Sequence, residues 1–154
     1  MTGMFNRDPA WSPDGRRIVF VRYDRGSASL YKIDPWGKHL QRLTGRQNYS
    51  EEPDWAPDGS RIVFVRTNYT YDGDDSPPTY VVRQFVASMK PNGSHMRRLT
   101  GKDRFVDEYW WYFPAWSPSS QRIAFSGPAG LTRMRRDGSG ERLLSKRGGS
   151  GLDW

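Results

Sequence analysis

One phrase returns three times along the chain, and it constrains the fold more than any other feature. Pro-Ala-Trp-Ser-Pro-Asp-Gly occupies residues 9–15, Pro-Asp-Trp-Ala-Pro-Asp-Gly occupies 53–59, and Pro-Ala-Trp-Ser-Pro-Ser-Ser occupies 114–120. An internal repeat of this period is typical of an array of small similar units, each of which buries its apolar faces against its neighbours. We therefore expect a repeat architecture.

A strand-like run follows each copy of the phrase. The runs are Arg-Ile-Val-Phe-Val at 17–21 and 61–65, and Arg-Ile-Ala-Phe-Ser at 122–126. Their β-branched and aromatic residues, bounded by turn residues, predict short buried strands. Pro-Asp-Gly predicts a tight hairpin turn, because proline fixes φ and glycine accepts a positive φ. The third copy has Ser119 and Ser120 instead of Asp-Gly, so we expect a looser or longer turn there.

Further equivalences complete a unit of four strands. Leu30, Val86 and Leu131 align in a third apolar segment, and a glycine follows each one in register. A last short segment ends each unit at residues 40–45, 96–101 and 142–145. Each unit is therefore expected to be four antiparallel strands connected by hairpins.

The spacing of the repeated tryptophans gives the size of a unit. Trp11 and Trp55 are 44 residues apart, Trp55 and Trp116 are 61 apart, and Trp116 and Trp154 are 38 apart. These spacings bracket the roughly 40 to 45 residues of a propeller blade. Residues 68–79 are polar and rich in turn formers, so we expect them to be a loop inserted into the middle unit. The predicted fold class is all-β, a β-propeller segment of three four-stranded antiparallel blades: blade one at 5–45, blade two at 46–101, blade three at 102–145, and the start of a fourth blade at 150–154.

The repeated residues also carry a family resemblance. With Pro-x-Trp-Ser-Pro-Asp-Gly, Arg-Ile-Val-Phe and a closing Arg-Leu-Thr, the chain resembles the WD40-like (PD40) repeats of the TolB β-propeller family from about Asp8 to Ser145. The resemblance implies a six-bladed propeller in full-length members, often periplasmic or secreted. It also implies a protein-binding platform or the gating domain of a serine peptidase.

Three units would make half of a six-bladed ring, so the outer faces of the first and third units are expected to be apolar and to need a neighbour. Two interpretations stay open. In one, two copies of the chain assemble head to tail into a six-bladed ring, with two equivalent junctions. In the other, the chain is a piece of a longer propeller protein.

A run of aromatic and acidic residues is the main candidate for partner binding. Residues 107–113 lead into the innermost strand of the third unit, and residues 48–52 are their counterpart in the second. In a propeller such segments line the mouth of the central channel, where aromatic faces and carboxylates can bind a peptide or a sugar. The alternative is that the aromatic side chains pack between blades. The candidate residues are Glu51, Glu52, Glu108, Tyr109, Trp110, Trp111 and Tyr112.

The chain is basic, with 24 Lys and Arg against 17 Asp and Glu and a net charge of +7. Many arginines recur with the repeat, and basic residues on outer strands discourage edge-to-edge aggregation. We favour this role over nucleic-acid binding, with acidic protein partners as a third possibility. A denser C-terminal set is the candidate for an anionic contact: Arg133, Arg135, Arg136, Lys146 and Arg147.

No residue pattern predicts catalysis, a metal or a cofactor, so a non-enzymatic binding scaffold is the expected function. His39 and His95 are the only histidines and are expected in surface turns one blade apart, and there is no cysteine. Asp72 to Asp75 lack the further ligands of a calcium loop, and residues 148–152 depart from the nucleophile-elbow pattern. No apolar run is long enough to span a membrane. The N-terminal residues lack the apolar stretch of a secretory signal, and the sequence leaves the compartment open.

Overall fold

The computed structural model describes residues 4–46, 48–71, 80–100, 113–127 and 129–146, and every regular element within them is a β-strand. Blade one contains β1 (Phe5–Trp11), β2 (Ile18–Asp24), β3 (Ser27–Ile33) and β4 (Gln41–Arg42). Blade two contains β5 (Tyr49–Trp55), β6 (Ile62–Tyr71), β7 (Tyr80–Met89) and β8 (Arg97–Arg98). Blade three contains β9 (Ala115–Trp116), β10 (Arg122–Gly127), β11 (Gly130–Arg135) and β12 (Arg142–Ser145).

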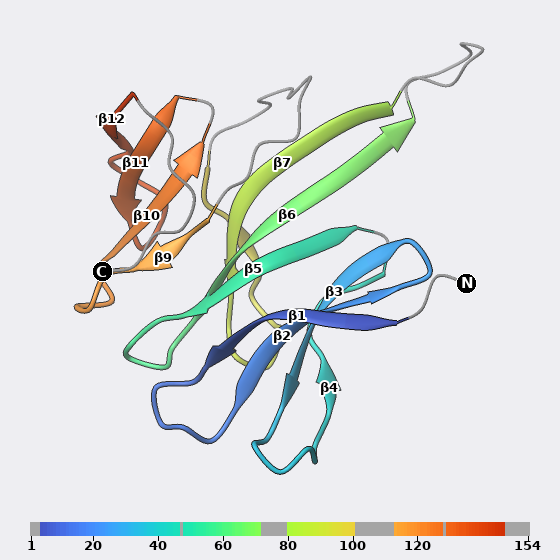
Figure 1. Ribbon diagram of the computed structural model, residues 1–154. Helices are drawn as coiled ribbons and strands as arrows, with labels where there is room; N and C mark the ends of the chain where they lie inside the picture. Colours follow the sequence, from blue (N-terminus) through green and yellow to red (C-terminus); the bar gives the residue numbers. More distant parts are fainter. Residues whose placement is uncertain (1–3, 47, 72–79, 101–112, 128, 147–154) are drawn as a thin grey trace.

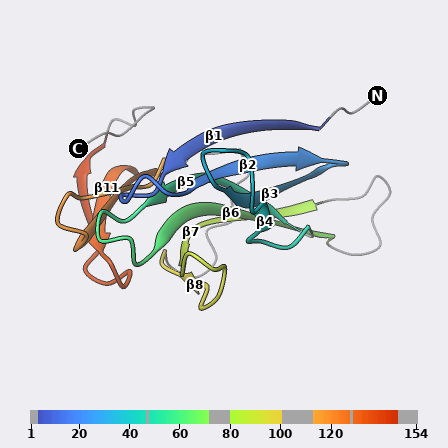
Figure 2. The ribbon, with the colours of Figure 1, turned by 90° about the horizontal axis from the view of Figure 1, so that it is seen from below.

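Each blade is one antiparallel sheet whose strands lie in chain order, which confirms the predicted fold class. The three sheets follow one another in space as they do along the chain, with blade two between its neighbours (Figures 1 and 2). The first strands of successive blades contact each other, β1 with β5 and β5 with β9. The short strands β4, β8 and β12 form the opposite edge of each sheet.

The turn between the first and second strands is the same in all three blades. In blade one the Gly15 N–H donates to the Ser12 carbonyl at 2.9 Å, and in blade three the Ser120 N–H donates to the Ser117 carbonyl at the same distance. The φ angle is 67° at Gly15 and 59° at Ser120. The expectation of a looser third turn is therefore wrong. Ser120 tolerates the left-handed conformation, which costs a non-glycine residue about 1 kcal/mol or more, because its Oγ accepts a hydrogen bond of 2.9 Å from the Asp58 N–H of blade two.

The start of the predicted insertion also needs correction. Residues 68–71 were expected in a loop, but β6 continues through Tyr71 and pairs with β7 down to the Tyr71 and Tyr80 pair. Tyr and Thr are strong strand formers, and the register places Asn68 opposite Arg83 and Tyr69 opposite Val82, so the hairpin ladder extends beyond the length of the other blades. Residues 72–79 lie outside the described residues.

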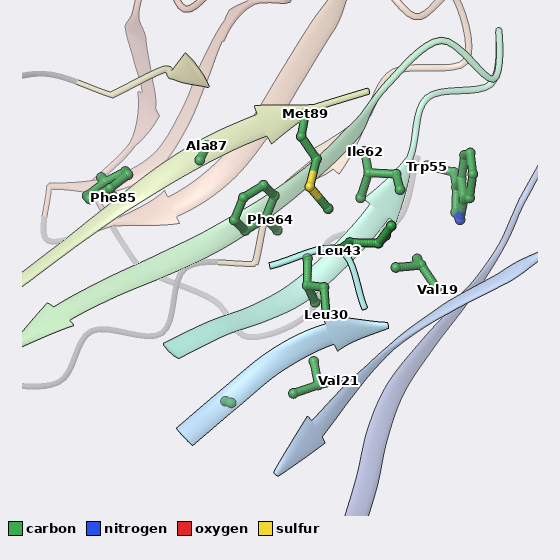
Figure 3. Close-up of a cluster of buried hydrophobic side chains, with 11 residues drawn as sticks. Val19, Val21, Leu30, Leu43, Trp55, Ile62, Phe64, Phe85, Ala87 and Met89 are labelled. Atoms are coloured by element: carbon green, nitrogen blue, oxygen red, sulfur yellow. The ribbon is translucent and has the colours of Figure 1, made fainter. Parts of the chain in front are cut away.

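Two apolar clusters hold the blades together. Between blades one and two, Val19, Val21, Leu30 and Leu43 pack against side chains of blade two that include Trp55, Ile62, Phe64 and Met89 (Figure 3). Between blades two and three, a second cluster contains Val63, Val65, Val86, Leu99, Trp116, Ile123, Phe125 and Met134. Alternate residues of β6 thus face opposite neighbours, so blade two is buried on both faces. Each such aliphatic or aromatic side chain contributes about 1.5–3 kcal/mol when fully buried.

Candidate functional site

The innermost strands β1 and β5 are interrupted at the same place. The register of β1 against β2 shifts between Arg7 and Ala10, and that of β5 against β6 shifts between Glu51 and Asp54. Asp8 has φ of 53° and Glu52 has φ of 52°, so both are in the left-handed region. Bulges of this kind re-aim a side chain away from the regular alternation of the strand. Two acidic residues therefore occupy equivalent bulges on neighbouring strands.

A hydrogen-bonded group connects these bulges across the junction of blades one and two. The Arg7 Nη2 of β1 donates to Glu51 Oε1 of β5 at 2.7 Å. The Tyr23 hydroxyl of β2 donates to the same carboxylate oxygen, and Arg7 also donates to this hydroxyl. Arg7 Nε lies 3.3 Å from Asp8 Oδ2. One guanidinium and one phenol thus hold Glu51 in place.

The acidic groups outnumber the single arginine in this group. Burial, with the charges of Asp8 and Glu51, raises the pKa of Glu52 from 4.5 to about 7. Burial also raises the pKa of Asp8, and Glu51 adds to this effect while Arg7 opposes it. Burial and the Glu51 hydrogen bond raise the pKa of Tyr23 above its usual value. Glu52 is therefore protonated more readily than an ordinary carboxyl group. We call the group the inner acidic cluster (Asp8, Glu51 and Glu52, with Arg7 and Tyr23).

The structure brings together only part of the predicted binding set. Glu51 and Glu52 lie in the inner acidic cluster, half-buried on β5. The remaining candidates, Glu108, Tyr109, Trp110, Trp111 and Tyr112, lie outside the described residues. Sequence reasoning missed Arg7, Asp8 and Tyr23. A signal existed for Asp8, because it precedes Trp11 by the same three residues that separate Glu52 from Trp55.

The basic residues predicted to form an anionic contact lie in different environments. Arg133 on β11 is half-buried, and Arg135 and Lys146 are exposed. Arg136 crosses to blade two, where its Nη1 lies 3.3 Å from Asp58 Oδ2 and its Nη2 donates to Ser60 Oγ at 2.9 Å. Arg147 lies outside the described residues. Arg136 thus already has an anionic partner within the chain.

Both histidines lie in the turn before the last strand of their blade. Their φ angles are 56° at His39 and 53° at His95, and the imidazole Nδ1 atoms lie 2.7 Å from Asp34 Oδ2 and 2.9 Å from Ser94 Oγ respectively. Among the residues that the structure describes, no group of three His, Asp or Glu side chains is arranged to hold a metal ion. The described part of the chain also has no helix of the length and hydropathy needed to cross a membrane.

Three four-stranded antiparallel sheets that pack face to face in chain order define a β-propeller segment. The chain belongs to the TolB beta propeller domain family (PD40), with a match that covers residues 2–150. No curated protein matches the chain.

Solved structures with the same fold include two TolB proteins and a peptidase. A protein assigned as TolB from Agrobacterium tumefaciens has a TM-score of 0.67 at 20% identity, covering 92% of this chain and 50% of that one. TolB from Acinetobacter baumannii has a TM-score of 0.67 at 18% identity, covering 92% and 32%. An acylaminoacyl peptidase has a TM-score of 0.60 at 18% identity, covering 92% and 25%. The chain thus spans half or less of these proteins, and the likeness is one of fold.

Proposed function

We propose that the chain is a non-enzymatic TolB-like propeller segment that binds a protein or peptide, and that the inner acidic cluster contacts a basic group of this partner. The observation that carries the proposal is the excess of carboxyl groups over guanidinium groups at adjacent bulges of β1 and β5. A raised carboxyl pKa means that the folded protein holds the ionised form at a cost. A lysine or arginine of a partner stabilises the ionised carboxylate, and this stabilisation adds to the free energy of binding.

The placement of the cluster also supports this proposal. Asp8 and Glu52 lie on the innermost strands, and this edge of a propeller borders the central channel. Both residues are half-buried rather than fully enclosed, although the Asp8 Oδ2 atom itself is buried. In the repeat alignment of the sequence, the segment that carries Glu51 and Glu52 has as its counterpart the one with Tyr109, Trp110, Trp111 and Tyr112. We include these aromatic residues in the proposal on that ground alone.

Fluorescence anisotropy with labelled hexapeptides tests this proposal. One peptide contains two arginines and the other contains two citrullines, which have nearly the same shape without the charge. The arginine peptide is expected to bind at pH 8 and the citrulline peptide to bind at least tenfold more weakly. Glu52→Gln combined with Asp8→Asn is expected to weaken binding of the arginine peptide about tenfold or more, because two carboxylates are lost.

Glu141→Gln with Asp137→Asn is the matched control, because it removes the same charge from exposed positions of blade three. This control is expected to keep the affinity within twofold. Equal weakening by both double variants would mean that only net charge matters, and the proposed site would be wrong. Equal binding of both peptides would contradict the choice of a basic partner.

Self-association into a larger ring is a second candidate, favoured by the end faces of the segment. Trp55 and Trp116 are 7% and 3% exposed at the junctions, whereas the equivalent Trp11 is 58% exposed. Leu43 and Leu99 are both 8% exposed, whereas Leu144 at the other end is 48% exposed. Trp11 on the first end face and Leu144 on the last end face are therefore the side chains that would cover each other in a head-to-tail assembly of two chains.

The solution mass of the chain tests this second candidate. A mass of two chains that returns to one chain in Trp11→Glu and in Leu144→Glu supports a head-to-tail dimer. A single-chain mass at concentrations up to about 100 μM contradicts self-association and leaves blades of a longer chain as the cover for these faces. The likeness to a peptidase propeller is one of fold and does not by itself favour a gating role.

A further inference from the structure

A cavity of about 430 Å³ opens between the first turns of blades one and two, apart from the inner acidic cluster. Pro13, Asp14 and Arg17 line it from blade one, and Trp55, Asp58 and Gly59 line it from blade two. The walls are therefore acidic and aromatic, with one guanidinium. The cavity is open to solvent because both aspartates are exposed.

At the equivalent position between blades two and three, two side chains make contacts across the junction. Ser120 Oγ accepts the Asp58 N–H, and the Arg136 guanidinium bridges Asp58 and Ser60 of the preceding blade. By the repeat alignment, Gly59 corresponds to Ser120, and Pro91 corresponds to Arg136, since each lies two residues before the turn glycine. A glycine and a proline thus replace a hydroxyl and a guanidinium. Gly59 lines the cavity directly.

The carboxylate of Asp14 lacks the close ion pair that its counterpart Asp58 makes with Arg136, although the charge of Arg16 acts on it electrostatically. Asp14 Oδ1 accepts hydrogen bonds from Ser12 Oγ at 2.6 Å and from the Arg16 N–H at 3.0 Å. Two further cations near the cavity donate to backbone carbonyls, Arg17 to Arg16 and Lys32 to Pro91. Within the described ranges, no Lys, Arg or His nitrogen lies within 4 Å of the Asp14 carboxylate.

Trp55 lines the cavity with an indole ring that is mostly buried. This side chain is 7% exposed, and its Nε1 has no hydrogen-bond partner among the described residues. In Figure 3 the indole nitrogen lies on the side of the ring nearer Val19 of blade one. A guanidinium has only N–H donors, so Trp55 contributes its ring to the wall of the cavity and not a hydrogen bond from this nitrogen. The Trp116 Nε1 at the other junction also has no hydrogen-bond partner among the described residues, so the difference between the junctions comes from Gly59 and Pro91.

We infer that this cavity binds the guanidinium group of an arginine side chain from a protein or peptide partner, next to Asp14 and against Trp55. At the neighbouring junction, a guanidinium of the chain itself makes the corresponding contact, because Arg136 donates to the Asp58 carboxylate. The inference shares with the proposed function only the class of partner. It concerns different residues, so either can fail without the other.

A titration with N-acetyl-L-arginine amide, followed by the indole N–H resonances in two-dimensional NMR, tests the inference. Trp55→Phe assigns the Trp55 resonance. This resonance is expected to shift with a dissociation constant on the order of 1 mM, which suits a ligand of this size in an open site. N-acetyl-L-citrulline amide is expected to bind at least fivefold more weakly, because it lacks the charge.

Variants of the two blades separate a specific site from nonspecific attraction. Asp14→Asn removes the carboxylate, and Pro91→Arg supplies an internal guanidinium, so each is expected to weaken binding at least fivefold. Gly59→Ser is expected to do the same by filling the space, and Ser120 shows that serine is tolerated at this turn position. Asp137→Asn, on an exposed turn of blade three, is the matched control and is expected to leave the affinity unchanged.

The converse change offers a gain of binding. Ser120→Gly with Arg136→Ala is expected to open a second cavity at the other junction, so that the Trp116 resonance also shifts with N-acetyl-L-arginine amide. Unchanged affinity in both Asp14→Asn and Pro91→Arg would overturn the inference. Equal binding of the arginine and citrulline amides would overturn it as well, even if the basic hexapeptide binds to the inner acidic cluster.

Discussion

The two blade junctions are built from the same repeat but are closed in different ways. Both have an apolar cluster that contains the tryptophan of the repeated phrase. The junction of blades two and three adds polar contacts at its turn end, where Asp54 Oδ2 accepts the Trp116 N–H at 2.7 Å and Arg136 contacts Asp58. The junction of blades one and two has polar contacts at the bulges, through Arg7 and Glu51. At its turn end it has a cavity and a hydrogen bond of 2.7 Å from Lys32 Nζ to the Pro91 carbonyl.

This difference separates what the repeat determines from what single residues determine. The apolar residues recur at equivalent positions, so they make every blade able to stack on the next one. The polar residues differ from blade to blade, so they decide which part of a junction is closed and which part is open to a ligand. Binding sites are therefore expected where the repeat is least regular, at Gly59, Pro91 and the bulge carboxylates.

Substitution of the tryptophans in the repeated phrase is expected to give the largest difference in the free energy of unfolding between equivalent positions. Trp55→Ala and Trp116→Ala are each expected to lower the free energy of unfolding by about 3–5 kcal/mol, because each leaves a cavity in an apolar cluster. Trp11→Ala is expected to cost about 0.5 kcal/mol or less in a single chain, because its side chain is exposed. Urea denaturation measures all three.

If Trp11→Ala is as destabilising as Trp55→Ala, another blade covers the first end face in solution. Where Trp55→Ala or Trp116→Ala does not fold, the phenylalanine variants at these positions keep the comparison, with smaller losses in the same order. Equal stability of the wild type and Trp116→Ala would contradict the packing between blades two and three.

Removal of the ion pair between Arg136 and Asp58, across the second junction, is expected to have an intermediate effect on stability. Arg136→Ala is expected to lower the free energy of unfolding by about 0.5–1 kcal/mol, which is typical of a partly exposed pair supported by a hydrogen bond. The loss is expected to shrink in 1 M salt, because salt screens exposed charges. Arg135→Ala is the control, since Arg135 is exposed one residue earlier. Similar losses for both variants would show that the contact with Asp58 contributes nothing specific.

The strands could be predicted from the sequence because their signals are local. The Ile-Val-Phe runs alternate between the two faces of each sheet, and the structure places Ile62 and Phe64 on one face and Val63 and Val65 on the other. The third turn could not be predicted, because the hydrogen bond that supports Ser120 comes from Asp58 in another blade. Local turn preferences contain no information about such a partner.

The candidate site could be predicted only in part for the same reason. Glu51 and Glu52 were found through the acidic segment in which they lie. Arg7 and Tyr23 come from two strands of another blade, and only the packing of blade one on blade two brings them to Glu51. The repeat alignment of Asp8 with Glu52 was readable, but the bulges that re-aim both residues depend on the pairing of the innermost strands.

The smallest expected effect is a pH dependence of stability between pH 4.5 and 7 that comes from the first junction. The pKa of Glu52 is about 7 in the folded chain and 4.5 in its ordinary state, so the folded state binds the proton more tightly. Stability is therefore expected to fall as the pH rises from 4.5 to 7 and to level off above 7. The position equivalent to Glu52 at the second junction is Phe113, which does not titrate. Because the Glu52 side chain is only half-buried, water limits the effect to a few degrees in Tm.

Glu52→Gln is expected to remove most of this fall, so that the variant has a higher Tm than the wild type at pH 8 and nearly the same Tm at pH 5. Thermal unfolding followed by circular dichroism at both pH values measures the difference. Asp8, whose pKa is also raised by burial, accounts for a residual slope at the acid end, and Asp8→Asn with Glu52→Gln is expected to remove it. A slope that persists in the double variant would place the titrating group outside the inner acidic cluster, and the two junctions would then not differ in their response to pH.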